Sequence, residues 1–256
     1  MLSFKNVTVQ FGGLTAINNL SFDVNEGTIH SIIGPNGAGK TTIFNIISRF
    51  YTPTSGEVTF DNQNILKLKP HQIIRTGIGR SFQNIELFKE MTVLDNLLIG
   101  LHAKLTMNLF ASALRLPSIL RSEASLKKRA KEIMDLLNIS EYAHEKVSNL
   151  PYGIQKMVDI GRTMMSDPKL ILLDEPVAGM NNKETEEISK LILKLKHDLN
   201  YTVLVIEHDM SLIMKISDYI TAVNFGEKIA EGLPHDVQNN ERVIEAYLGE
   251  EQNDEN

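Results

Sequence analysis

One stretch of the sequence decides the fold: Gly34-Pro35-Asn36-Gly37-Ala38-Gly39-Lys40-Thr41, which fits the pattern G-x-x-x-x-G-K-S/T. It follows the run Ile29–Ile33 and opens the helix-like segment 41–50, so it joins a predicted strand to a predicted helix. Glycines let successive backbone N–H groups turn inward around a phosphate, and the helix N-terminus adds a partial positive charge. We therefore interpret the stretch as a phosphate-binding loop; a glycine-rich turn without a ligand is the weaker alternative.

Two side chains at the end of this loop carry specific chemistry. Lys40 is expected to reach the β and γ phosphates of a nucleoside triphosphate. The Thr41 hydroxyl suits Mg²⁺, a hard cation that prefers oxygen ligands. The sequence thus predicts ATP and Mg²⁺ as ligands. The expected contacts are Gly34, Pro35, Asn36, Gly37, Ala38, Gly39, Lys40, Thr41 and Thr42.

Two adjacent carboxylates follow the apolar run 170–173. Asp174 and Glu175 therefore lie at the carboxyl end of a predicted strand, the edge at which open α/β sheets bind ligands. Because successive side chains on a strand point apart, we assign them different roles: Asp174 toward Mg²⁺, partly through water, and Glu175 toward the attacking water as general base. The alternative, that one acid caps a following helix, is disfavoured by Pro176.

Short apolar runs alternate with an amphipathic segment in the second half of the chain. The runs 170–173 and 203–206 are wholly apolar, as strands buried on both faces usually are. The segment 183–197 between them repeats apolar residues at helical spacing. These residues are Ile188, Leu191, Ile192 and Leu195. Strand, helix and strand in this order predict a parallel sheet and an α/β fold class.

Other parts of the chain have different patterns. Regular alternation of apolar and polar residues at 3–10 and 18–24 predicts antiparallel strands. The stretch 92–166 contains no convincing strand and is interpreted as helices, including 126–137 and the segment after Tyr152. Within it, 103–125 contains leucines without clean periodicity, which favours ordinary helix and loop packing over a partner surface.

The length of 256 residues allows one domain or a domain with an insertion. We predict a single domain over 1–256. In it, 1–91 and 167–256 form an α/β core with an antiparallel β subdomain, and 92–166 forms an inserted helical subdomain.

The composition of the chain limits the classes of protein to which it can belong. The chain has 42% apolar and 23% charged residues, no cysteine, and no apolar run near the roughly 18 residues that a spanning helix needs. The start lacks the features of a signal peptide, so we expect a cytoplasmic chain that does not cross a membrane by itself. The net charge is −6, and residues 241–256 hold six acids against Arg242. The remainder is almost neutral, which argues against nucleic acid as a partner.

The two motifs and their order resemble those of ATP-binding cassette (ABC) ATPases. Lys40 and Asp174 are 134 residues apart, a helical insertion lies between them, and a glutamate follows the aspartate directly. The resemblance covers nearly the whole chain. It implies the P-loop NTPase fold of ABC ATPases, with a RecA-like core.

The resemblance also implies further site residues. The motif Arg80-Ser81-Phe82-Gln83 ends in a glutamine that in the family touches Mg²⁺ and the attacking water, and whose loop contacts the membrane subunit. His208, in Glu207-His208-Asp209, matches a histidine that contacts the γ-phosphate. Phe11 matches an aromatic residue that stacks on adenine; its alternative is a core strand residue.

The signature of the family is altered in this chain. It reads L-S-G-G-Q in the family and Leu150-Pro151-Tyr152-Gly153-Ile154-Gln155 here, so the serine hydroxyl that donates to the γ-phosphate held by the other subunit is lost. Tyr152, Gly153 and the helix N-terminus remain as expected nucleotide contacts, and such a terminus is worth roughly 0.3 to 2 kcal/mol to an anion. Asn181 stands where the family commonly has an aspartate that contacts the facing subunit. We expect hydrolysis to be reduced and not abolished.

Several stretches resemble the LivG-type ATPases of bacterial branched-chain amino-acid importers. They include Phe11-Gly12-Gly13-Leu14, the motif 80–83, Ala178-Gly179-Met180-Asn181, Glu207-His208-Asp209-Met210 and Ala246-Tyr247-Leu248-Gly249-Glu250. Lipopolysaccharide export shares the Tyr-Leu-Gly-Glu ending but not the other surroundings, and urea or amide importers remain as alternatives.

The resemblance implies an assembly. Two such ATPases pair head to tail, as self or paralogue, with each ATP between the phosphate loop of one and the signature of the other. The expected partners are membrane permease subunits and an external substrate-binding protein, and the expected location is the cytoplasmic face of the membrane. Two rivals stay open: a soluble ABC protein acting on nucleic acid or ribosomes, and an ATP-sensing module without turnover.

Overall fold

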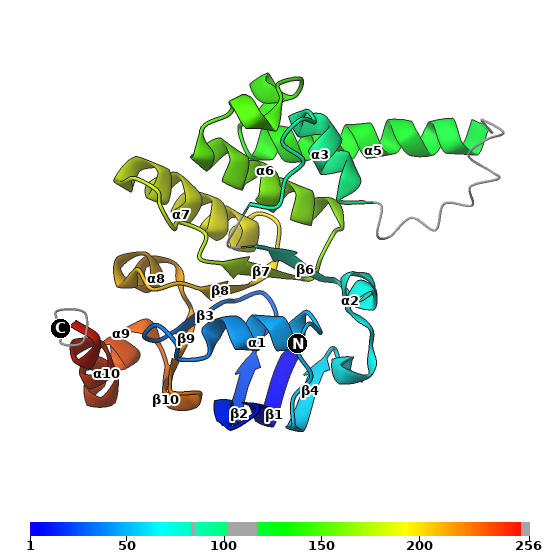
Figure 1. The fold of residues 1–256 in the computed structure, drawn as a ribbon. Helices are drawn as coiled ribbons and strands as arrows, with labels where there is room; N and C mark the ends of the chain where they lie inside the picture. The colour runs from blue at the N-terminus through cyan, green and yellow to red at the C-terminus, as the bar shows by residue number, and fades with distance from the viewer. Residues whose placement is uncertain (83–84, 102–116, 252–256) are drawn as a thin grey trace.

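The strands form two β-sheets (Figure 1). The computed structural model describes residues 1–82, 85–101 and 117–251. The smaller sheet is antiparallel in the order β2-β1-β4-β5. Its strands are β1 (Leu2–Phe11), β2 (Leu14–Val24), β4 (Ser55–Phe60) and β5 (Gln63–Asn64). The predicted strands 3–10 and 18–24 are confirmed; β2 starts earlier than predicted because Phe11 pairs with Leu14 across a tight turn at Gly12.

The larger sheet has the order β10-β9-β3-β8-β7-β6. Its strands are β3 (Ile29–Ile33), β6 (Ile78–Ser81), β7 (Leu170–Asp174), β8 (Thr202–Ile206), β9 (Tyr219–Asn224) and β10 (Glu227–Gly232). Neighbours run parallel except β9 and β10, which form a hairpin. Every residue of β3, β7 and β8 is buried, which confirms the interpretation of the apolar runs.

The helix after the phosphate loop, α1 (Lys40–Ile47), lies between the two sheets (Figure 1). Its Ile43, Phe44, Ile46 and Ile47 are buried in one apolar cluster with residues of both sheets. The prediction of a helix to residue 50 was too long. Ser48 caps the helix, and Arg49 has the left-handed φ of 62°, which ends the helical path.

Eight further α-helices complete the described part of the chain. They are α2 (Pro70–Thr76), α3 (Val93–Ile99), α5 (Pro117–Leu136), α6 (Tyr152–Met165), α7 (Asn182–His197), α8 (Met210–Ile216), α9 (Pro234–Gln238) and α10 (Glu241–Glu251), with short 3-10 turns η1 (Ile65–Lys67), η2 (Ser140–Tyr142) and η3 (Val147–Asn149). Helices α3, α5 and α6 gather beyond the β6 and β7 edge of the sheet (Figure 1). Of the irregular segment 103–125, the described part from Pro117 is helical, and the remainder lies outside the described residues.

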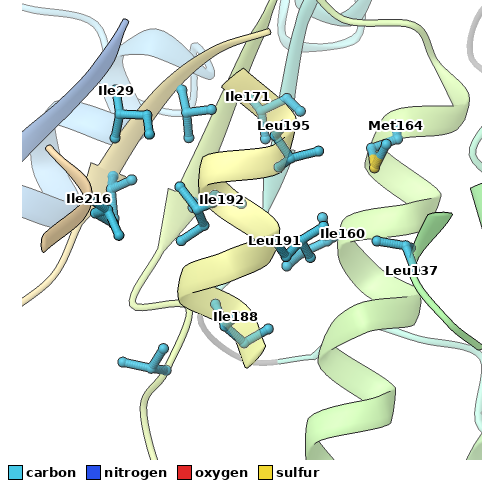
Figure 2. Packing of buried hydrophobic residues seen from close by; sticks show 14 of the residues in the cluster. Ile29, Leu137, Ile160, Met164, Ile171, Ile188, Leu191, Ile192, Leu195 and Ile216 are labelled. Carbon is cyan, nitrogen blue, oxygen red and sulfur yellow. The ribbon is translucent and has the colours of Figure 1, made fainter. Parts of the chain in front are cut away.

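The predicted apolar face of α7 is confirmed (Figure 2). Ile188, Leu191, Ile192 and Leu195 are buried and belong to a cluster that also holds Ile171 of β7 and Ile160 of α6. None of the helices in the described part of the chain has the length and apolar content to cross a membrane.

Candidate functional site

A pocket of about 290 Å³ opens where the phosphate loop joins α1. It is lined by Leu14, Thr15, Ala16, Asn36, Gly37, Ala38, Gly39, Lys40, Thr41, Thr42, Glu175 and Phe225. The structure therefore brings most of the predicted loop residues together with one of the two predicted carboxylates. Phe225 was not predicted.

The loop can follow its path because two positions require glycine. Gly34 has φ 153°, and a Cβ there would lie 2.1 Å from the carbonyl oxygen of Val223. Gly39 has φ 103°, and a Cβ there would lie 2.8 Å from the carbonyl oxygen of Ala16. Strand β9 and the start of β2 thus close around the loop, so only a residue without a side chain fits at either position.

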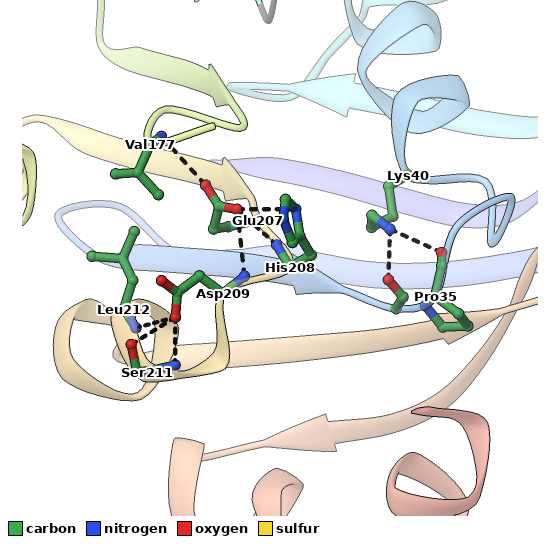
Figure 3. Close-up of polar contacts among 9 residues, drawn as sticks. Pro35, Lys40, Val177, Glu207, His208, Asp209, Ser211 and Leu212 are labelled. Carbon is green, nitrogen blue, oxygen red and sulfur yellow. Dashed lines mark hydrogen bonds and ion pairs between the residues drawn. The ribbon is translucent and has the colours of Figure 1, made fainter. Parts of the chain in front are cut away.

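Lys40 folds back inside the loop (Figure 3). Its Nζ donates hydrogen bonds to the carbonyl oxygens of Gly34 at 2.5 Å and Pro35 at 2.9 Å, and the residue is buried. The ammonium group is therefore held at the centre of the loop, where phosphate oxygens would be recognised.

The two carboxylates at the end of β7 lie in different surroundings. Asp174 is buried and accepts a hydrogen bond from Nη2 of Arg80 at 2.7 Å, whereas Glu175 lines the pocket. Glu175 has the left-handed φ of 43°, and its N–H donates to the carbonyl oxygen of Ile206 at 2.9 Å. A strained, non-glycine backbone of this kind is often retained at functional sites because it aims a side chain.

His208 follows β8 and is held by a carboxylate that sequence reasoning missed. Glu207 is fully buried and accepts hydrogen bonds from the N–H groups of His208 at 2.9 Å and Val177 at 3.4 Å (Figure 3). Burial raises the pKa of Glu207, and these N–H donors and His208 oppose the rise. The Nδ1 atom of His208 lies 3.2 Å from Oε1 of Glu207, while the ring stays largely exposed. Glu207 therefore orients the imidazole of His208. Its position directly before the histidine is the feature by which Glu207 could have been predicted from the sequence.

Phe11 lies at the surface, at the end of β1. Its side chain is exposed, so the alternative of a core residue is wrong. The ring packs edge to face on Tyr51, with centroids 5.0 Å apart, and Phe11 is not among the described residues that line the pocket. The aromatic residue on the pocket wall is Phe225, at the turn between β9 and β10. An aromatic residue directly before the glycine of a hairpin turn was the signal that could have found it.

The signature residues lie apart from the phosphate loop within one chain. Pro151 is the N-cap of α6 and makes no side-chain capping bond. Gly153 lines a second pocket of about 320 Å³ with Pro151, Asn181 and Glu184. A Cβ on Gly153 would lie 2.9 Å from Oε1 of Glu184, so Gly153 lies against the side chain of Glu184 in the first turn of α7. Tyr152 is exposed beside it. The predicted Gln83 lies outside the described residues.

The oxygen donors near the loop fit Mg²⁺ bound together with phosphates. Thr41 lies in the first turn of α1 and lines the pocket, and Asp174 supplies a carboxylate at the end of β7. Within residues 1–82, 85–101 and 117–251, no group of three or more histidine, aspartate or glutamate side chains is arranged to hold a metal ion. Mg²⁺ is usually bound by few protein ligands, and phosphate and water supply the remaining ligands.

Comparisons with known proteins agree with this geometry. A family model described as "ABC transporter" matches residues 17–178, and one described as "Branched-chain amino acid ATP-binding cassette transporter" matches residues 227–253. The chain is 44% identical over 250 residues to the high-affinity branched-chain amino acid transport ATP-binding protein LivG of Escherichia coli (strain K12), covering 98% of each.

Two solved structures are similar over most of their length. One is the ADP conformation of MJ1267, an ATP-binding cassette of an ABC transporter, with 34% identity and a TM-score of 0.85 over 97% of this chain and 98% of that one. The other is the dimeric post-hydrolysis state of the cassette MJ0796 bound to ADP and Pi, with 30% identity and a TM-score of 0.76 over 91% of this chain and 99% of that one.

Proposed function

The chain belongs to the ATP-binding cassette (ABC) transporter family, and from this premise we propose that it drives the import of branched-chain amino acids. As an ABC ATPase it binds nucleotide and hydrolyses ATP to ADP and phosphate. The predicted family and its P-loop α/β fold are confirmed. The substrate, the metal and the residue roles are our proposals.

The substrate proposal is carried by one observation: the match of residues 227–253 to a family model for branched-chain amino acid transporters. This region comprises β10, α9 and α10 and lies outside the stretch matched by the general ABC model. The similarity to LivG over nearly the whole chain supports the same substrate class. Import of urea or short amides is the alternative that the test must separate.

We assign the catalytic roles from the geometry of the pocket. Lys40 and the loop amides would bind the β and γ phosphates, and Thr41 and Asp174 would hold Mg²⁺ with Gln83. The metal would neutralise charge on the phosphates as it develops. Glu175, on the pocket wall, would accept the proton of the attacking water. His208, oriented by Glu207, would donate a hydrogen bond to the γ-phosphate.

We assign the partners from the same premise. The phosphate loop and the signature lie in separate pockets of one chain, so a second ABC ATPase, in head-to-tail contact, would complete each ATP site. Tyr152 and Gly153 would then meet the nucleotide held by the partner. Permease subunits would supply the membrane path and an external binding protein the substrate. The chain would sit at the cytoplasmic face.

The test is transport by the assembled complex. We expect proteoliposomes that contain the chain, its co-purified permease subunits and the paired ATPase to accumulate labelled leucine or isoleucine when ATP is enclosed with the chain and the external binding protein is added outside. Urea and acetamide should neither be taken up nor compete. Uptake of urea or an amide in place of leucine would contradict the substrate, and recovery of only soluble partners from native membranes would contradict the transporter role.

A matched variant tests the general base. Glu175→Gln keeps the size of the side chain and removes its proton acceptor, so turnover should fall at least about a hundredfold while nucleotide affinity stays within a few-fold. Glu132→Gln, which changes an exposed carboxylate on α5 that is not among the described lining residues of either pocket, is the control. Unchanged turnover of Glu175→Gln would remove Glu175 from the mechanism.

A further inference from the structure

The guanidinium group of Arg80 joins the elements that carry the proposed metal ligands. Arg80 lies on β6, and its Nη2 donates to Oδ2 of Asp174 at 2.7 Å. Its Nη1 donates to Oδ1 of Asn45 at 2.9 Å and to Oγ of Ser48 at 3.1 Å. Asn45 lies in α1 and Ser48 caps it, and the first turn of α1 carries Thr41. One side chain therefore connects the helix with one proposed ligand to the strand with the other.

The contact between Arg80 and Asp174 is buried, and two aromatic rings lie near the guanidinium group. The side chains of Arg80 and Asp174 are only 9% and 3% exposed. The Cζ atom of Arg80 lies 5.4 Å from the ring centroid of Phe44 and 5.0 Å from that of Phe82. A planar guanidinium can contact aromatic rings and donate several hydrogen bonds in a fixed fork, which a lysine ammonium cannot reproduce. The position of the Asp174 carboxylate is thus specified by geometry as well as by charge.

Helix α6 fixes the strand end from which Arg80 projects. Oγ of Ser81 donates to Oδ2 of Asp159 at 2.6 Å, and Nζ of Lys156 donates to the carbonyl oxygen of Phe82 at 2.9 Å. Asp159 and Lys156 are themselves buried. The backbone that carries Arg80 is therefore anchored on the signature helix, and its side chain is anchored on α1 and β7.

We propose that Arg80 is a positioning residue of the metal site: it fixes the carboxylate of Asp174 relative to α1, so that Thr41 and Asp174 face a single Mg²⁺ with one oxygen of Asp174 already engaged. The inference rests on the proposed function, because it assigns Arg80 a task at that same nucleotide site. Residues that orient metal ligands typically change metal affinity by about 10- to 100-fold when they are replaced.

A positioning role and a charge role predict opposite results. If Arg80 only neutralised the buried Asp174, its loss would leave a more negative site, and Mg²⁺ would bind more tightly. If Arg80 fixes geometry, its loss releases the carboxylate and Mg²⁺ binds more weakly. Lysine separates the two roles because it keeps the charge and loses the fork.

The experiment is a binding titration of the purified full-length chain with a fluorescent, non-hydrolysable ATP analogue, in excess Mg²⁺ and in EDTA. The ratio of the two dissociation constants measures how much Mg²⁺ contributes. We expect this ratio to fall about tenfold or more in both Arg80→Lys and Arg80→Gln, with the affinity in EDTA within about threefold of wild type. Arg80→Lys retains a cation beside Asp174, so it protects the test against an unfolded Arg80→Gln.

Arg49→Gln is the matched control. The Arg49 guanidinium also bridges several segments, through the carbonyl oxygens of Leu68 and Tyr51, and none of its hydrogen-bond acceptors in the described part of the chain is a carboxylate. Its loss should lower the thermal midpoint and leave the Mg²⁺ ratio unchanged. A wild-type ratio in Arg80→Lys, or a raised ratio in Arg80→Gln, would overturn the positioning role alone. A wild-type chain that binds no nucleotide would overturn the proposed function and this inference with it.

Discussion

At the scale of single residues, Phe225 has an unfavourable backbone and an exposed ring. Its φ is 46°, and 84% of its surface is exposed. The turn is fixed to the phosphate loop, because the N–H of Gly226 donates to the carbonyl oxygen of Ala38 at 3.0 Å. A bulky residue in left-handed conformation costs about 1 to 2 kcal/mol, and this cost at the pocket wall leads us to predict that the ring contacts the nucleotide base.

Replacing Phe225 should separate stability from binding. Phe225→Asn relieves the backbone, so the chain should become about 1 kcal/mol more stable to urea. Loss of the ring should weaken ATP binding about fivefold or more, by the usual worth of base stacking, and leave binding of inorganic tripolyphosphate unchanged. Phe50→Ala, an exposed phenylalanine that is not among the described lining residues, is the control. Equal losses for ATP and tripolyphosphate would place Phe225 in support of the loop instead.

His30 makes the stability of the fold depend on pH. Its Nε2 lies 2.9 Å from Oγ1 of Thr221, between β3 and β9, and burial lowers the pKa of His30 from 6.5 to about 4. The folded state therefore resists protonation more than the unfolded state does. The stability that the neutral ring contributes is complete above pH 6.5 and is lost as the pH falls through about 4, by up to about 3 kcal/mol.

Urea unfolding of His30→Gln tests this dependence. The difference in free energy of unfolding between wild type and His30→Gln should shrink from pH 7 to pH 4.5, because only the wild type must bury an imidazole that tends to protonate. The exposed His71, changed to glutamine, provides the control. A wild-type advantage that stays constant over this range would contradict the assignment.

The residues that the sequence predicted are those whose chemistry is local. The loop 34–41 and the pair Asp174–Glu175 form contiguous patterns. Arg80 contacts Asp174 across 94 positions of sequence, so no local pattern links them. Phe225 reaches the loop pocket only because β9 lies beside β3 in the sheet. The part of the site that the sequence did not predict is therefore the part formed by contacts between segments that are far apart in sequence.

At the scale of elements, α7 shows what Asn181 does in place of an aspartate. Its Oδ1 accepts hydrogen bonds from the N–H groups of Lys183 at 3.0 Å and Glu184 at 3.1 Å. Oε2 of Glu184 accepts in return from the N–H of Asn181 at 3.0 Å, which completes a capping box. The amide thus retains the capping role that an aspartate would have, without the charge.

The loss of stability on removal of this cap should be measurable. Asn181→Ala is expected to lose about 1 kcal/mol of unfolding free energy in urea, whereas Asn181→Asp should lose none, because a carboxylate caps and suits the helix N-terminus. Asn182→Ala, one position further along and also exposed, is the control for the residue type. Equal effects at Asn181 and Asn182 would refute the capping role.

Element boundaries were predicted best where the hydrophobic pattern is complete. The strands 170–173 and 203–206 and the helix 183–197 agree with β7, β8 and α7 to within about one residue. The end of α1 was missed because Phe50 continues the apolar pattern after the backbone has already turned at Arg49. The start of α5 was missed because its first turns lack clean apolar spacing.

At the scale of the whole molecule, the signature lies on another surface than the phosphate loop, so its composition should matter only in the assembled pair. Pro151→Ser restores a hydroxyl at the N-cap of α6. A hydrogen bond to a charged group contributes about 1.5 kcal/mol, so turnover of the assembled complex should rise roughly tenfold. ATP affinity of the isolated chain should not change. An equal gain in turnover by the dilute, unpaired chain would contradict contact across subunits.

The position of β3 in the sheet has a consequence for biogenesis. Strand β3 leads into the phosphate loop, yet its two neighbours, β8 and β9, are encoded about 170 and 190 residues later. At about 5 to 20 residues per second, a ribosome needs roughly 10 s or more to deliver them. During that interval, the nascent chain holds a strand whose neighbours in the sheet have not yet been made. The phosphate loop that follows β3 can therefore reach its final position, and bind nucleotide there, only near the end of synthesis.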